Sequence, residues 1–408
     1  MKSKFKLFFP CYFSFFVNGA MVLMVGAILP YIIDEAGINY SIAGGFLSAF
    51  AIGNLLASFI NPLLAAKIGR KATIVSLSAL IPLMFFVITL LPPVPVIYGA
   101  FVLVGIGRGS VSIINNAVVN DNSDGNPAAL NLLHMVFAVG AFIAPFLTAV
   151  YINNGLGWRA AAYTIIAGST LSCIFYALMQ IDYNWTVDSK KFKKSLESSS
   201  EDFTEGADSG LDKAPENASV PFYKTYVFYI MGLLLFLYLG LENCVNGWFV
   251  TYFKSMGIMS ETYAANLVSV TWVMVMFGRL ATAKLSGRVN KNVLILVNCI
   301  ATAVFFFLLT ATQNLTVITV AIAGLGFFFA GIYPTCVSSA GNVIKGSNTG
   351  MSMLLAIAAL GGIITPQIVG VIADKMGLMG AIFILSINVA GMFVMALFNM
   401  KFNSTKSK

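Results

Sequence analysis

Long apolar stretches recur along the whole chain, and short charged or turn-rich segments separate them. Each stretch is long enough for an α-helix to cross the hydrocarbon core of a bilayer, which takes about 20 residues. The first stretch exceeds a signal-peptide core and lacks a small-residue cleavage site, so we interpret it as a membrane helix. The pattern predicts an all-α membrane protein with twelve transmembrane helices, over residues 7–33, 41–66, 72–92, 94–119, 127–152, 158–181, 222–252, 261–284, 292–311, 314–338, 348–373 and 378–400.

One polar segment, residues 182–221, breaks this pattern. Its first part is rich in lysine and its middle is rich in Asp and Glu. Low hydrophobicity with mixed charge is typical of a flexible linker. We therefore expect a six-helix bundle over 1–181, a cytoplasmic linker over 182–221 and a second six-helix bundle over 222–408.

The two predicted bundles resemble each other when the second is aligned on the first without a gap, so that Gly240 falls on Gly19. Because the shift covers six helices, an even number, both halves enter the membrane in the same direction and form a parallel repeat. Gly and Pro are frequent in membrane helices, which is the alternative explanation for these matches. One offset shared by several helix pairs favours a repeat. The matches are Gly19 with Gly240, Gly26 with Gly247, Tyr31 with Tyr252, Gly105 with Gly326, Gly140 with Gly361 and Pro145 with Pro366.

Composition and charge agree with a membrane location. Apolar residues make up 58% of the chain and charged residues 10%, against roughly 25% charge in soluble domains. Lysine and arginine gather in the loops on the side of the N-terminus, which by the positive-inside rule places both termini in the cytoplasm. These loops account for the net charge of +8, so it does not indicate a nucleic-acid partner. We expect a monomer in the plasma or inner membrane.

Four ionisable residues fall within predicted helices, where a charge costs at least about 2.5–3.5 kcal/mol. Glu242 is predicted to carry a proton or to anchor substrate, and a buried ion pair with Arg108 is the alternative. Arg108 fits direct substrate contact equally well. His134, the only histidine, is a candidate for substrate contact or proton coupling, although such a residue also links helices. Arg279 is expected to have a structural role near the cytoplasmic end of its helix.

Uncharged polar side chains provide further candidates for substrate binding. Amides hydrogen-bond to sugar hydroxyl groups, and tryptophan packs against the apolar face of a sugar ring. The alternative for each amide is a hydrogen bond between helices. The candidates are Asn18, Asn54, Asn116, Asn131, Asn246, Trp272 and Gln367.

The loop after the second helix, Lys67 to Lys71, resembles the end of the signature loop of the major facilitator superfamily. The resemblance implies a structural role for Lys67, Arg70 and Lys71. Ala66 stands where that loop usually has an acidic residue, which puts the carboxylate–arginine latch of the loop in doubt.

Other segments resemble the fucose–galactose–glucose:proton symporter family, which implies proton-coupled sugar import. Members of the fucose type have acidic residues in helices 1 and 4, where this chain has Asn18 and Arg108. The proton-coupling group therefore cannot be transferred by position. The matching segments are Leu130 to His134 with Gly140 and Pro145, Gly240 to Glu242 with Gly247 and Trp248, Gly278 to Leu280, Gly331 to Thr335, and Gly361 with Pro366 and Asp374.

No catalytic, nucleotide-binding or metal-binding motif is present in the sequence, so we expect neither an enzyme nor a cofactor. The favoured hypothesis is a secondary transporter that imports a neutral sugar or similar small polar solute with a proton. Sodium remains an alternative coupling ion, because oxygens around Glu242 could coordinate it. An exporter of drugs or metabolites is the second hypothesis. A non-transporting sensor on a transporter scaffold is the third.

Overall fold

The computed structural model describes residues 2–123, 127–179, 222–286, 288–344 and 348–404. The predicted linker over 182–221 lies outside these residues. The first bundle contains α1 (Lys2–Ala36), α2 (Tyr40–Ile68), α3 (Arg70–Ser78), α4 (Leu80–Thr89), α5 (Val94–Asn122), α6 (Pro127–Asn153) and α7 (Gly157–Leu178). The second contains α9 (Tyr226–Ser255), α10 (Glu261–Ser286), α11 (Lys291–Thr310), α12 (Leu315–Phe329), α13 (Ile332–Ile344), α14 (Asn348–Phe383) and α15 (Ser386–Ser404).

These helices give twelve crossings of a membrane, as the hydrophobic pattern predicts. By length and composition, 11 helical stretches of the described chain can cross a bilayer, and the last of them, Gly350–Phe402, contains two crossings. The chain turns inside α14 at Gly377, whose φ of 76° is one that glycine adopts without steric cost. Breaks near Ala79 and Gly331 divide two other predicted helices into α3 with α4 and α12 with α13.

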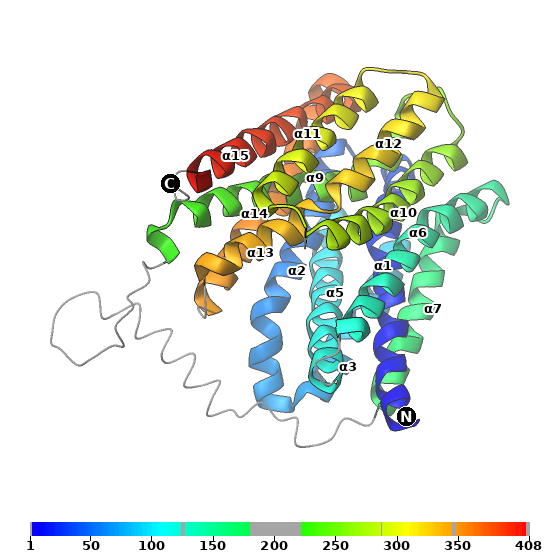
Figure 1. Ribbon diagram of the computed structural model, residues 1–408. Helices are drawn as coiled ribbons and strands as arrows, with labels where there is room; N and C mark the ends of the chain where they lie inside the picture. Colours follow the sequence, from blue (N-terminus) through cyan, green and yellow to red (C-terminus); the bar gives the residue numbers. More distant parts are fainter. Residues whose placement is uncertain (1, 124–126, 180–221, 287, 345–347, 405–408) are drawn as a thin grey trace, which may run out of the picture.

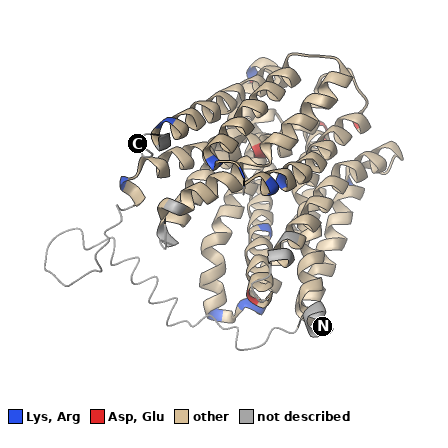
Figure 2. Ribbon diagram, in the orientation of Figure 1, with Lys and Arg blue, Asp and Glu red and all other residues tan. Residues whose placement is uncertain are grey.

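The outer surface of the bundles is apolar and suits contact with lipid. Phe59, Leu83 and Leu280 have 60%, 58% and 68% of their surface exposed. Figure 2 shows that acidic and basic positions are few and that most of the helical surface carries neither. Water would not favour such a surface, whereas hydrocarbon does.

The contacts between the bundles follow the predicted repeat. In the alignment that places Gly240 on Gly19, α1 corresponds to α9, α2 to α10 and α6 to α14. The bundles meet through α1 with α9, α2 with α14 and α6 with α10, so the last two contacts are equivalent under the repeat. Within the bundles, Gly105 packs on the carbonyl group of Phe50 and Gly326 on that of Thr271. The same alignment superimposes both members of this contact, which supports a parallel repeat.

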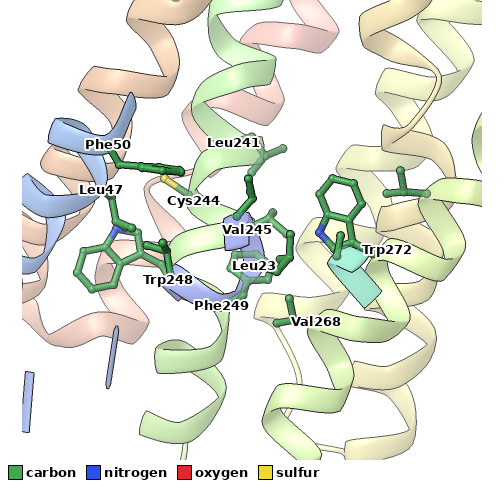
Figure 3. Close-up of a cluster of buried hydrophobic side chains, with 14 of the residues drawn as sticks. Leu23, Leu47, Phe50, Leu241, Cys244, Val245, Trp248, Phe249, Val268 and Trp272 are labelled. Carbon is green, nitrogen blue, oxygen red and sulfur yellow. The ribbon is translucent and has the colours of Figure 1, made fainter. Parts of the chain in front are cut away.

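A close backbone approach between the bundles involves glycine. A side chain at Gly26 in α1 would collide with the backbone carbonyl of Asn246 in α9. Small residues allow membrane helices to approach this closely. A hydrophobic cluster surrounds the contact and includes Leu23 of α1, Leu47 of α2 and Trp248 of α9 (Figure 3).

Candidate functional site

A cavity of about 330 Å³ lies between the two bundles. Its wall is built by α1, α2, α5 and α6 of the first bundle and by α9, α10, α13 and α14 of the second. The lining residues recur every three or four positions, as in Phe15, Asn18, Val22 and Val25 of α1, so one face of each helix forms the wall. A pocket of this volume, shared by two bundles, suits a small solute.

Charged and aromatic side chains meet in this cavity. The carboxylate of Glu242 accepts a hydrogen bond of 3.4 Å from the hydroxyl group of Tyr238. The guanidinium of Arg108 lies over the Phe50 ring, 5.5 Å from its centroid, and Arg279 reaches the cavity from α10. Within the described residues no ion pair within 4.0 Å joins Glu242 to either arginine, so the alternative Glu242–Arg108 pair is not formed in this conformation.

Most of the residues predicted to bind substrate line this cavity. The Oδ1 atom of Asn246 accepts a hydrogen bond of 3.2 Å from the indole N–H of Trp272, which fixes both side chains in the wall. The Oδ1 atom of Asn18 is buried and has no hydrogen-bond partner among the described residues. The lining includes Asn18, Asn54, Arg108, His134, Glu242, Asn246 and Trp272.

Three predicted residues do not contribute to the described lining. Asn116 donates a hydrogen bond of 2.8 Å to the carbonyl group of Ser112 in its own helix. Gln367 donates one of 3.2 Å to the carbonyl group of Ser41 in the other bundle. The side chain of Asn131 lies outside the described part of the structure.

The sequence predicts a structural role for Arg279, and the structure places its side chain in the wall of the cavity. Arg279 follows Trp272 by seven residues, about two helical turns, so the two share a face. The spacing from Trp272 could have identified Arg279 as a cavity residue in the sequence.

Of the loop residues predicted to have a structural role, Lys67 and Lys71 are exposed, and Arg70 lies 3.4 Å from the carboxylate of Asp121.

Aromatic residues of the cavity wall were also missed, because Phe and Tyr occur throughout the helices and only packing shows which face inward. Tyr238 and Tyr333 come from the second bundle, and their rings lie 5.9 Å apart. Phe15, Phe50 and Phe137 come from the first. These rings give the polar groups of the site an apolar surround.

On one side of the cavity the bundles are joined by a polar network, here called the closed face. The Tyr31 hydroxyl group donates a hydrogen bond of 2.7 Å to Glu261, and Lys254 lies 3.1 Å from the carboxylates of both Asp34 and Glu261. The ammonium group of Lys254 also lies 4.4 Å from the centroid of the Tyr31 ring. The network joins the end of α1 to α9 and α10.

Asp374 of α14 closes the same face from the other edge. Its carboxylate accepts hydrogen bonds from the backbone N–H groups of Tyr40 at 2.7 Å and Ser41 at 3.0 Å, and from the hydroxyl group of Ser41. A carboxylate is favourable at a helix N-terminus because the unpaired N–H groups and the helix dipole attract it. In Figure 1, α1, α2 and α5 of the first bundle run in a different direction from α11 and α15 of the second.

We expect Asp374→Asn to weaken the closed face. Asparagine keeps one acceptor oxygen but loses the charge and the second acceptor oxygen, which together cost roughly 0.5–2 kcal/mol, enough to raise the population of conformers open on this side several-fold. Spin labels at Asn154, after α6, and Ser255, at the end of α9, would report the distance across the face. The distance distribution should gain a longer component, whereas Asp121→Asn, at an exposed site away from the face, should leave it unchanged.

Comparisons with known proteins show the family. Residues 11–353 match the model of the Major Facilitator Superfamily. The glucose/mannose transporter GlcP of Bacillus subtilis is 23% identical over 373 residues, covering 88% of this chain and 86% of that protein. A D-xylose-proton symporter has the same fold, with a TM-score of 0.75, 13% identity and coverage of 97% of both chains.

The E. coli fucose:proton symporter FucP is also similar in structure, with a TM-score of 0.59 and 19% identity over 96% of this chain and 98% of that one. The resemblance to sugar transporters seen in the sequence is thereby confirmed, and the relatives are transporters rather than enzymes. A cavity between two bundles related by a parallel repeat is the architecture of these proteins. The chain therefore belongs to the Major Facilitator Superfamily of membrane transporters.

Proposed function

We propose that this protein is a proton-coupled symporter that imports a sugar or a similar small polar solute. The observation that carries the proposal is Glu242, a carboxylate in a cavity built by both bundles. An ionisable group at this depth is costly, and such groups in transporters are typical of ion pathways. Tyr238 is its hydrogen-bond partner within the cavity.

The polar lining supports a sugar-sized solute. Asn18, Asn54 and Asn246 offer amide groups for hydroxyl groups, and Trp272 offers an aromatic face for the ring. The volume of about 330 Å³ is at the lower end of ligand pockets, which span about 300–1,000 Å³. His134 lines the same cavity and would contact the solute or share the proton.

Transport would proceed by alternating access, with the two bundles rocking about the cavity. The positive-inside rule places the termini in the cytoplasm, so the closed face is on the outside and this conformer faces inward. A proton on Glu242 would change the free-energy difference between outward- and inward-facing states, because the two states bind it with different affinity. We propose a monomer in the plasma or inner membrane.

The test is uptake of labelled hexoses and pentoses into proteoliposomes. An inwardly directed proton gradient should concentrate at least one sugar, and a sodium gradient of equal size should not. Accumulation under sodium alone would reassign the coupling ion. Failure of folded protein to take up any sugar or sugar derivative under either gradient would contradict the proposal and favour export of a larger solute.

A further inference from the structure

We infer that the solute carries a carboxylate, so that the site binds a sugar acid more tightly than the corresponding neutral sugar. The inference rests on the proposed function and narrows its substrate class. It departs from the neutral sugar that the sequence favours. Two arginines in the cavity, one from each bundle, are its basis.

Neither guanidinium group has an anionic partner within ion-pair distance in the described part of the chain. Arg108 forms no ion pair within 4.0 Å among these residues, and its buried Nε atom has no hydrogen-bond partner there. Arg279 likewise forms no ion pair within 4.0 Å in the described ranges. A guanidinium group buried without an anion is costly, and since both arginines line the cavity, a carboxylate of the solute is the partner that would offset this cost.

The charge of the lining points to an anion. In the described lining, two guanidinium groups and the single carboxylate of Glu242 leave one positive charge in excess when His134 is neutral. In a cavity at membrane depth an uncompensated charge costs more than in water. One carboxylate on the solute would balance it while Glu242 is ionised, and when Glu242 carries the coupled proton the same carboxylate would lower the excess from two positive charges to one.

Arginine also provides the geometry for this ligand. Its planar fork of N–H donors matches the two oxygens of a carboxylate. The Arg108 guanidinium lies over the Phe50 ring, 5.5 Å from its centroid, which gives it an aromatic neighbour in the wall of the cavity. The amides and Trp272 remain for the hydroxyl groups and ring of the solute.

The position of the two arginines links binding to transport. Arg108 belongs to α5 of the first bundle, and Arg279 belongs to α10 of the second. An anion held by both would favour conformers in which the bundles approach each other around the solute. Because the anion would bind this occluded state, closed on both sides, more tightly than the open states, it would lower the free energy of the occluded state.

Matched ligands test the inference in purified protein. Glucuronate and glucose differ only at C6, as do galacturonate and galactose, so their ratio of dissociation constants measures recognition of the carboxylate. At least one acid should bind tenfold or more tightly than its neutral partner. Arg108→Gln or Arg279→Gln should reduce that ratio about tenfold or more, because a hydrogen bond to a charged group is lost.

The ratio also separates recognition from misfolding, since affinity for the neutral sugar should change less than threefold in these variants. Arg108→Lys should retain part of the preference, because it keeps the charge and loses the fork. Arg288→Gln, at an exposed arginine outside the cavity, should have no effect. A ratio that neither cavity variant changes would overturn the inference, as would tighter binding of glucose 6-phosphate than of glucuronate.

Uptake distinguishes failure of the inference from failure of the proposed function. Proton-driven uptake of neutral hexoses with exclusion of every hexuronate would overturn the inference and leave the symporter proposal intact. Folded protein that takes up neither a neutral hexose nor a hexuronate would contradict both the inference and the symporter proposal. Proton-driven uptake of a hexuronate, competed by its neutral partner only at tenfold or higher concentration, is the result expected.

Discussion

Glu242→Gln is expected to abolish accumulation of substrate under a proton gradient while exchange of labelled for unlabelled substrate continues. Glutamine keeps the size of the side chain and an oxygen for the Tyr238 hydroxyl group, but it cannot bind and release a proton. With one proton per solute, a gradient of one pH unit supports up to about tenfold accumulation. In the variant the ratio of internal to external solute should fall to about one, as measured by filtration of proteoliposomes.

The control for this experiment is Asp121→Asn. Asp121 is an exposed carboxylate near the end of α5, outside the cavity, so accumulation should remain at the wild-type level. If Glu242→Gln accumulates substrate as well as wild type does, another group carries the proton. His134, which lines the same cavity, would be the next candidate.

Gly26→Val is expected to prevent closure of the closed face and to stop transport. The added side chain would overlap the carbonyl group of Asn246 in the other bundle, and a backbone group cannot move aside as a flexible side chain can. The bundles must therefore separate on this side. With spin labels at Asn154 and Ser255, the distance across the face should lengthen and the short-distance population should disappear.

Two other glycines make the experiment specific. At Gly99 an added Cβ atom meets no atom within 4 Å beyond its own stretch of helix, so Gly99→Val should change neither the distance between the spin labels nor transport. Gly140→Val collides with the carbonyl group of Phe16 within one bundle, so it should lower the thermal stability of the protein. A Gly26→Val variant that retains the short distance and normal uptake would contradict the close packing described above.

The fold could be predicted because a bilayer imposes strong constraints on a chain. Apolar runs of membrane-spanning length and an ungapped internal repeat are visible in one dimension. Breaks inside the membrane helices were harder to predict, since the hydrophobic pattern continues across them. The turn at Gly377 was anticipated as a helix boundary, whereas the break at Gly331 lies inside a predicted helix.

The candidate site could be predicted in part, because an ionisable group in an apolar run stands out. Arg108, His134 and Glu242 were identified in this way, and all three line the cavity. Amides were less informative, since they serve binding and helix packing equally. Asn246 faces the cavity, whereas Gln367 holds the bundles together, and no local pattern distinguishes the two.

The closed face could not be predicted at all. Its contacts join residues far apart in sequence, as Asp374 with Ser41 and Lys254 with Asp34. These contacts belong to one conformer of a protein that must adopt others, so they are determined by the relative position of the bundles rather than by any helix. The residues at these helix ends have the composition of an ordinary protein surface, so the sequence does not indicate the contacts between the bundles.

Substrate-induced proton movement tests the central proposal most directly. Adding a transported sugar or sugar acid to de-energised proteoliposomes in weakly buffered medium should make the external pH rise as protons enter with the solute. Glu242→Gln vesicles should show no pH change. Entry of the solute without any rise in external pH in wild type would contradict proton symport.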